Sequence, residues 1–192
     1  MTGVQTCALP ILEPHLKPSD WKSVLSAYGF GFSDDTPGMA VDLQALNESM
    51  PKIDGLEIRA VTDDESLKTW IKVFLHGMGL PPDWESMTYE MYMQLGLDLP
   101  VRSYLGYLNG KPVSTSTLFL GGGAAGVWSV ATLPEARGKG LGAALTLQPL
   151  LDAREMGYRA GVLQSSDMGF NIYKKLGFRH LCQIEYFYLS IK

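Results

Sequence analysis

Cysteine, long apolar runs and excess positive charge are all scarce in this sequence. Its two cysteines, Cys7 and Cys182, provide neither a disulfide framework nor zinc-ligand spacing, and they fit a reducing compartment. No apolar stretch reaches the ~18 residues of a membrane span. The formal net charge of -4 disfavours wholesale binding to nucleic acid or to anionic membranes. We therefore expect a cytoplasmic protein that binds no metal, membrane or nucleic acid.

The chain has the composition of one globular domain. It has 192 residues, of which 46% are hydrophobic and 19% are charged, as is ordinary for a domain of this length. Residues 1–11 are the exception, because they resemble the translation of a sequencing adapter and lack the charged n-region of a signal peptide. We expect them to be a non-native scar, with native sequence starting near Leu12 and the gene truncated there.

Residues 12–54 are predicted to be a helix–strand remnant followed by a linker. "SDWKSVLSAY" (19–28) predicts a short helix capped by Ser19 or Asp20. "GFGF" and "SDDTPG" predict turns, and "MAVDL" predicts a strand. This helix–Gly-Phe–strand order recurs at "YKKLGF" near the C-terminus, either as a repeat or as an unrelated joint.

Residues 55–192 are predicted to form the main domain, which opens with a strand at 56–61. Thr62 and Glu65 then form a T-x-x-E capping box that starts a helix. A second helix is indicated by apolar residues at i, i+3, i+7 and i+11, and we expect this face to be core. Its members are Trp84, Met87, Met91 and Leu95.

Strands dominate the middle of the domain. Asn109-Gly110 is a strong signal for a tight hairpin between two strands, and "VWSVATL" predicts the next strand. A helix to about Met156, a strand at 160–166, a helix at 168–176 and a strand from Phe178 follow. This order predicts one α/β domain around a mixed sheet.

A basic, glycine-rich hexamer, Arg137 to Gly142, separates the "VWSVATL" strand from the helix after it. Unpaired N–H groups and the positive end of the dipole make such a helix start an anion site. Its three glycines would let the backbone approach phosphate oxygens, and Arg137 and Lys139 would add mobile charge. The P-loop pattern is absent because Gly140 follows Lys139, and the dinucleotide pattern lacks its acidic residue, so another nucleotide-binding family is disfavoured.

Arg137-x-x-Gly140-x-Gly142, together with "NIYKKLGF", resembles the GNAT superfamily of acyl-CoA-dependent N-acetyltransferases over residues 56–190. The resemblance implies a GNAT-like mixed, mainly antiparallel central sheet flanked by helices, and acetyl-CoA as cosubstrate. Ser166 stands where the family often has asparagine, and Gly169 where alanine is usual. Pro149, inside the predicted helix, is a further departure.

The resemblance also implies the cofactor-binding residues. Backbone groups of Val130, Ala131 and Thr132 would pair with the pantetheine arm, and Ser166 would contact it. The pyrophosphate would lie on the N–H groups of Arg137, Gly138, Lys139, Gly140, Leu141 and Gly142.

For the chemistry, the resemblance makes Tyr173 the candidate acid for the leaving thiolate and the Val130 N–H the oxyanion donor. No general base is assigned, because the fourth strand of the predicted domain carries no carboxylate. Tyr89, Tyr92 and Met93 either line the acceptor pocket or form an exposed flank.

Two functions remain open from the sequence. The first is an N-acetyltransferase acting on a primary amine of a small molecule or peptide. The second is a non-catalytic acyl-CoA-binding or regulatory domain. A homodimer is compatible with either.

Overall fold

In the computed structural model, the described residues are 11–12, 20–49 and 51–189. Residues 1–10, which make up nearly all of the predicted scar, lie outside them. The helices are α1 (Trp21–Ala27), α2 (Asp64–Met78), α3 (Glu85–Leu95), α4 (Leu141–Glu155) and α5 (Asp167–Lys175). The strands are β1 (Ile11–Leu12), β2 (Phe30–Asp42), β3 (Leu56–Ala60), β4 (Val101–Leu108), β5 (Lys111–Gly121), β6 (Ala124–Thr132), β7 (Ala160–Gln164) and β8 (Arg179–Leu189).

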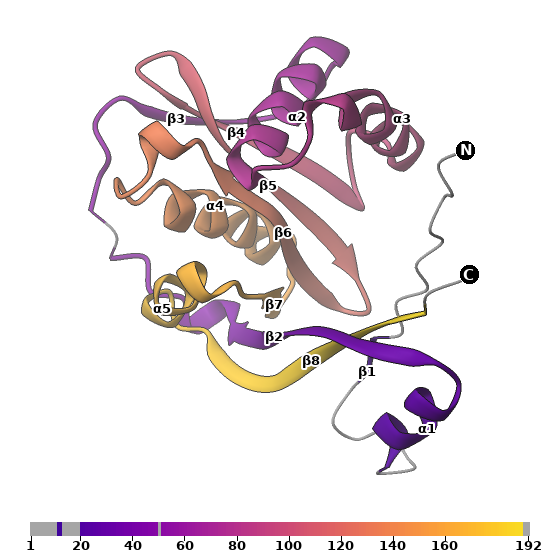
Figure 1. Cartoon of the computed structure of the whole chain (residues 1–192). Coiled ribbons are helices and arrows are strands. Elements are labelled where there is room, and N and C mark those ends of the chain that lie inside the picture. Colours follow the sequence, from indigo (N-terminus) through magenta and orange to yellow (C-terminus); the bar gives the residue numbers. More distant parts are fainter. Residues whose placement is uncertain (1–10, 13–19, 50, 190–192) are drawn as a thin grey trace.

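All eight strands belong to one sheet, in the order β1-β8-β2-β7-β6-β5-β4-β3 (Figure 1). Neighbouring strands are antiparallel except β6 and β7, which are parallel. The expected mixed, mainly antiparallel sheet is therefore confirmed.

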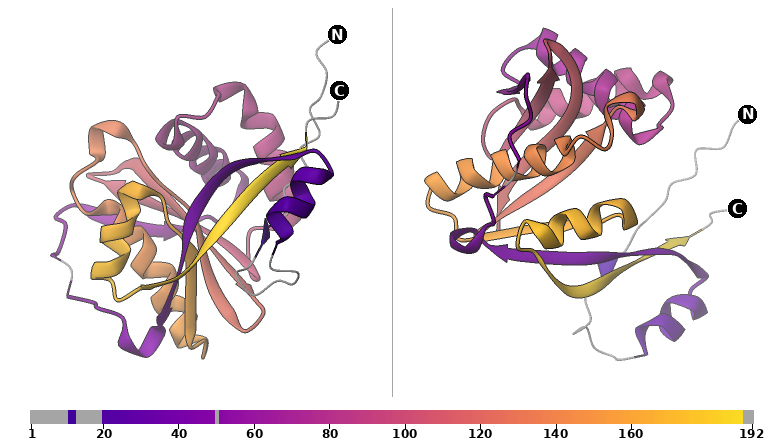
Figure 2. Two further views of the ribbon diagram at one scale, coloured as in Figure 1. Left: turned by 60° about the horizontal axis from the view of Figure 1, so that its bottom comes forward. Right: turned by 90° about the vertical axis from the view of Figure 1, so that its left-hand side faces the viewer.

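Helices cover both faces of this sheet. Helices α2 and α4 each contact β4, β5 and β6, so they lie on opposite faces of the same strands (Figure 2). On the α2 side, Trp70 is fully buried and stacks on Phe74. On the α4 side, Leu145 and Leu150 fill the core against the sheet. None of the helices in the described part of the chain is long and apolar enough to cross a membrane.

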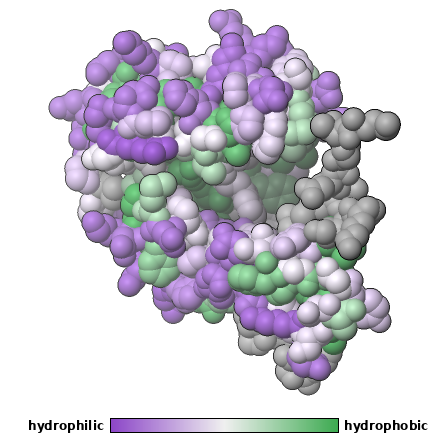
Figure 3. Space-filling model, viewed as in Figure 1, coloured by the Kyte–Doolittle hydropathy of each residue, from purple (hydrophilic) through white to green (hydrophobic). Residues whose placement is uncertain are grey.

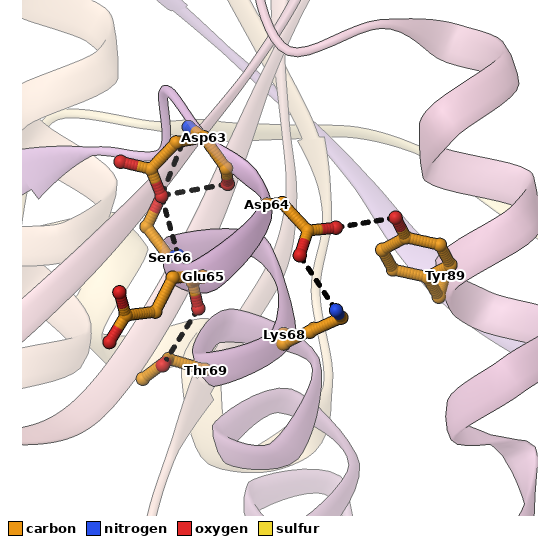
Figure 4. Close-up of polar contacts among 7 residues, drawn as sticks. All are labelled: Asp63, Asp64, Glu65, Ser66, Lys68, Thr69 and Tyr89. Atoms are coloured by element: carbon orange, nitrogen blue, oxygen red, sulfur yellow. Dashed lines mark hydrogen bonds and ion pairs between the residues drawn. The ribbon is translucent and has the colours of Figure 1, made fainter.

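Two of the local predictions concern turns and caps. The Asn109-Gly110 hairpin is confirmed, with φ of 52° and 76° at the two turn residues, which a two-residue type I′ turn requires. The Thr62–Glu65 capping box is wrong by one position, because Asp63 caps α2 and exchanges hydrogen bonds with Ser66 (Figure 4). A carboxylate accepts the free helix N–H better than the threonine before it.

The predicted core face of α3 is also wrong. Met87, Met91 and Leu95 are 60%, 50% and 48% exposed, whereas Thr88 and Tyr92 are buried. The sheet beneath α3 presents hydroxyl groups, and the polar tip of Tyr92 satisfies them where a methionine cannot. The apolar stripe therefore faces away from the core.

Strand β2 is much longer than the "MAVDL" strand predicted from the sequence. Strand β2 includes most of the predicted "GFGF" turn and all of the predicted "SDDTPG" turn. It lies between β8 and β7 in the sheet. Met39 and Val41 in it are 2% and 5% exposed. A strand of the predicted N-terminal remnant thus lies in the interior of the main sheet.

Strands β2 and β8 follow their helices in the same way. Gly29 after α1 and Gly177 after α5 both adopt left-handed φ, of 83° and 103°, which ends each helix without a side-chain clash. The strands that follow then pair with each other in antiparallel fashion. The two Gly-Phe joints therefore share their local geometry.

Candidate active site

The centre of the sheet opens between β6 and β7. These strands pair through three residue pairs only, from Ala124–Ala160 to Gly126–Val162. Beyond them β6 stays on β5 while β7 stays on β2, so the two strands diverge. Figure 3 shows a hollow crossing this face of the molecule. We call this opening the splay.

A bulge in β6 lies at the start of the splay. Trp128 pairs with Thr117 and Ala131 pairs with Thr115, so β6 carries one extra residue there. Ser129 in the bulge adopts a left-handed φ of 53°, which is uncommon for a residue other than glycine. Its carbonyl accepts a 2.9 Å hydrogen bond from the Thr115 hydroxyl.

The bulge also has a partner in α3. The Tyr92 hydroxyl lies 3.3 Å from Ser129 Oγ and 3.4 Å from Thr117 Oγ1. Burial raises the pKa of Tyr92, so its phenol stays protonated at neutral pH. Of the three residues considered for the acceptor pocket, Tyr92 thus reaches the splay, whereas Tyr89 bonds to Asp64 beside Lys68 (Figure 4).

Strand alternation decides which backbone groups of β6 face the splay. The Leu133 N–H donates to Val113 O at 2.9 Å, and Ala131 pairs with Thr115 on the same side. Because successive residues of a strand direct their N–H groups to opposite edges, Val130 and Thr132 direct theirs into the splay. This geometry fits the role expected for the Val130 N–H, while the Ala131 backbone is engaged by β5.

The hexamer forms a tight turn into α4. Gly138 and Gly140 have left-handed φ of 77° and 82°, and Gly140 is the N-cap. The first helical hydrogen bond runs from Ala144 N–H to Gly140 O, so the N–H groups before it have no helical acceptor. A Cβ on Gly142 would meet nothing within 4 Å. This open side allows an anion to approach the N–H groups.

Arg137 differs from the mobile cation we expected. Its guanidinium donates to Gly77 O at 2.8 Å and to Thr132 O at 3.2 Å. Gly77 lies in the last turn of α2, where free carbonyls favour a cation. Arg137 therefore ties α2 to the end of β6, while Lys139 is exposed beside the turn.

Helix α5 begins at the same edge of the splay as α4. Strands β6 and β7 are parallel, so the helices that follow them both start at this edge, with their positive dipole ends towards it. Ser166 is the N-cap of α5, and its Oγ accepts from the Gly169 N–H at 3.3 Å. Helix α4 runs through Pro149 from Leu141 to Glu155 without a break.

Tyr173 is buried between α4 and α5. Its ring lies against Gly169, where a Cβ would come within 2.6 Å of it, which accounts for glycine at that position. Burial raises the pKa of Tyr173, and the neighbouring Thr146 hydroxyl offsets part of the rise. A phenol with a raised pKa stays protonated at neutral pH and can donate a hydrogen bond to an anion beside it.

The sequence did not identify Ser129, Thr115 and Thr117, which shape the bulge. A signal was available, since "STST" in β5 and Ser129 in β6 are polar residues inside strands. In the described part of the chain, a pair of pockets lies elsewhere and shares no residue with the splay. One, of about 420 Å³, is lined by Phe30, Phe32 and Phe187 among others, and the second, of about 250 Å³, includes Asp42, Arg159 and Arg179.

Comparison with known proteins identifies a protein family that this part of the chain matches. Residues 101–180, which hold the splay strands and the hexamer, match the family model described as an acetyltransferase (GNAT) domain. No protein of curated function matches the chain.

Solved structures share the fold. A GCN5-related N-acetyltransferase from Kribbella flavida has a TM-score of 0.72 and 19% identity, over 96% of this chain and 68% of that one. One from Sphaerobacter thermophilus has a TM-score of 0.73 and 19% identity, over 98% of this chain and 61% of its own. This chain thus spans about two thirds of these relatives. A predicted acetyltransferase with acetyl-CoA from Clostridium acetobutylicum has a TM-score of 0.55 and 16% identity, over 66% of this chain and 91% of its own.

Proposed function

Because the chain belongs to the GNAT superfamily, we propose that it is an N-acetyltransferase that moves the acetyl group of acetyl-CoA to a primary amine. The observation that carries this proposal is the splay, with the Val130 N–H directed into it and two helix starts at its edge. A solved relative of the same fold is described with acetyl-CoA.

The cosubstrate would bind through backbone groups. The free N–H groups at the start of α4 suit the pyrophosphate, because they combine hydrogen-bond donors with the positive end of the helix dipole. The free edge of β6 at Val130 and Thr132 suits the amides of the pantetheine arm, which would pair there like an added strand. Ser166 at the start of α5 would contact the same arm from the other side of the splay.

Acetyl-CoA supplies the acetyl group as a thioester when bound. The Val130 N–H would stabilise negative charge on the thioester oxygen, and the bulge at Ser129 fixes its direction. The Tyr173 hydroxyl would donate a proton or a hydrogen bond to the departing thiolate. The described part of β6 carries no carboxylate, so the amine would lose its proton to water.

The acceptor in this proposal is a small molecule or a peptide. The cytoplasm is the proposed location, supported by the scarcity of cysteine in the sequence. The net charge of -4 supports an enzyme that does not depend on nucleic acid or anionic membranes as partners.

Gly142→Val tests the anion site without straining the turn. Gly142 lies in α4 with open space around its Cβ position, so valine would keep the fold and block approach to the N–H groups. Calorimetry should show parent protein binding acetyl-CoA and Gly142→Val binding it at least about tenfold more weakly. Ala144→Val is the control, because the Ala144 N–H is already bonded to Gly140 O.

Equal affinity of Gly142→Val and parent would place the pyrophosphate elsewhere. An assay of thiol release with a panel of primary amines tests transfer itself. Binding of acetyl-CoA without acetylation of any amine would favour the non-catalytic acyl-CoA-binding alternative.

A further inference from the structure

The closed end of the splay carries a flat apolar surface. Phe119, Gly126 and Val162 lie in one row across β5, β6 and β7, because Phe119 pairs with Gly126 and Gly126 pairs with Val162. Paired residues of a sheet point to the same face. Thr117 lies two residues before Phe119 and contacts Tyr92 of α3, so the row lies on the α3 face of the sheet.

Two glycines let the aromatic rings of this surface lie flat. A Cβ on Gly126 would meet Trp128 Nε1 at 2.8 Å, and a Cβ on Gly121 would meet Phe119 Cε1 at 2.7 Å. The indole of Trp128 thus covers Gly126, between Phe119 and Val162. We call these three side chains, Phe119, Trp128 and Val162, the platform.

The platform is open to solvent although it is apolar. Phe119, Trp128 and Val162 are 45%, 44% and 36% exposed. The backbone of Trp128 is followed directly by Ser129 of the bulge, and Val130 lies two residues on, ~6.6 Å along a strand, while the indole itself leans back over Gly126. The platform therefore adjoins the point at which the acetyl group would be transferred, with the Tyr92 and Ser129 hydroxyls on the side towards it.

The chemistry of the platform selects among amines. Asp42, which pairs with Ala160 on the same face, already has its carboxylate bonded to Arg159, so a polyamine or an aminoglycoside would find no free carboxylate among these residues to pair with its extra ammonium groups. Exposed aromatic faces attract other aromatic rings by stacking, and tryptophan also attracts a cation. We propose that the acceptor is an aromatic ring joined by a short spacer to a primary amine, with the ring on Trp128 and Phe119.

This inference rests on the proposed function and deepens it. Acetylation of 2-phenylethylamine should show the lowest KM in a set that includes hexylamine and spermidine. Trp128→Ala should raise the KM for 2-phenylethylamine about tenfold, while the KM for acetyl-CoA stays unchanged. Trp128→Phe should retain most of the affinity, and Tyr28→Ala, which removes an aromatic ring that is 75% exposed at the C-terminal end of α1, should match the parent.

A second measurement does not require turnover. Titration of 2-phenylethylamine into the parent–CoA complex should give a heat signal that Trp128→Ala loses. An absence of binding to the parent complex would overturn the inference, as would equal use of spermidine or an unchanged KM in Trp128→Ala. A changed preference for longer acyl-CoA thioesters in Trp128→Ala, with the amine KM unaltered, would assign the platform to the acyl chain instead.

Failure of the proposed function would look different. A parent protein that binds neither CoA nor acetyl-CoA would contradict the acetyltransferase proposal as a whole. A parent that acetylates spermidine without preference for an aromatic amine would contradict the platform alone.

Discussion

The sheet has two halves that are built in different ways. Strands β3 to β6, the consecutive half, follow one another in the chain and pair in that order. Strands β1, β8, β2 and β7, the composite half, come from both ends of the described chain and interleave. In the first half, short turns such as Leu108–Lys111 join β4, β5 and β6, whereas the second half pairs residues as far apart in the chain as Gly38 and Gln164.

The two halves contribute different parts of the candidate site. The consecutive half supplies the bulge, the Val130 N–H and the platform residues Phe119 and Trp128. The composite half supplies the opposite wall of the splay, with Val162, and is followed there by α5 with Tyr173. Neither half contains the whole site, and the two are hydrogen-bonded through only three residue pairs.

The largest expected effect is loss of folding when the composite half is broken at β2. Met39 is 2% exposed in the core, and an uncompensated aspartate there should cost on the order of 4 kcal/mol of unfolding free energy. Met39→Asp should therefore unfold at much lower urea than the parent. Ser33→Asp, an exposed change in the same strand, should unfold with the parent.

If Met39→Asp unfolded at the same urea concentration as Ser33→Asp, β2 would be dispensable for folding. The consecutive half would then be stable with β7 and β8 alone. Circular dichroism during urea unfolding distinguishes these outcomes.

A kinetic effect of intermediate size tests whether both halves take part in the reaction. Tyr173→Phe keeps the ring on Gly169 and removes the proton donor, so turnover should fall by ~10²–10⁴ with acetyl-CoA affinity little changed. Because burial raises the pKa of Tyr173, its ionisation should not reduce the parent rate below about pH 10. A steady-state pH profile of parent and variant measures both.

Tyr188→Phe, which removes a hydroxyl from a half-exposed ring of β8, is the control for that experiment. Parent-like turnover in Tyr173→Phe with a confirmed acceptor would remove Tyr173 from the mechanism.

The smallest expected effect concerns the exposed stripe of α3 in the consecutive half. Met91 is 50% exposed, so Met91→Ala should change the unfolding free energy by less than about 0.5 kcal/mol. Leu67→Ala, at a fully buried position of α2, should cost about 2–5 kcal/mol. Similar losses in the two variants would mean that the stripe is covered in solution.

The sequence predicted the strands of the consecutive half better than those of the composite half, because hairpin turns are local. Asn109-Gly110 specifies its turn through backbone conformation alone. The full length of β2 depends on Gln183 and Gln164, which lie far along the chain and pair with Pro37 and Gly38. Aspartate and glycine in its sequence favour turns, and the partner strands override that preference.

The candidate site divides in the same way. The hexamer could be predicted, because glycine spacing and the helix after it are local. The polar residues inside β5 and β6 were a signal for a special position, but they did not specify the bulge, since the left-handed Ser129 is held by Thr115 and Tyr92 from two other elements. The stripe of α3 was predicted to face the core because its apolar residues recur at helical spacing. The sheet surface beneath α3 is polar, so the stripe faces solvent instead.

The position of β2 has a consequence for how the protein is synthesised. On the ribosome, β2 emerges roughly 120 residues before β7, so at ~5–20 residues per second it waits about 6–24 s for its neighbour. During that interval Met39 and Val41, which end in the core, have no sheet to join. The nascent chain therefore exposes an apolar, aggregation-prone interior strand during most of its translation. The yield of folded protein should depend on chaperones that shield such segments.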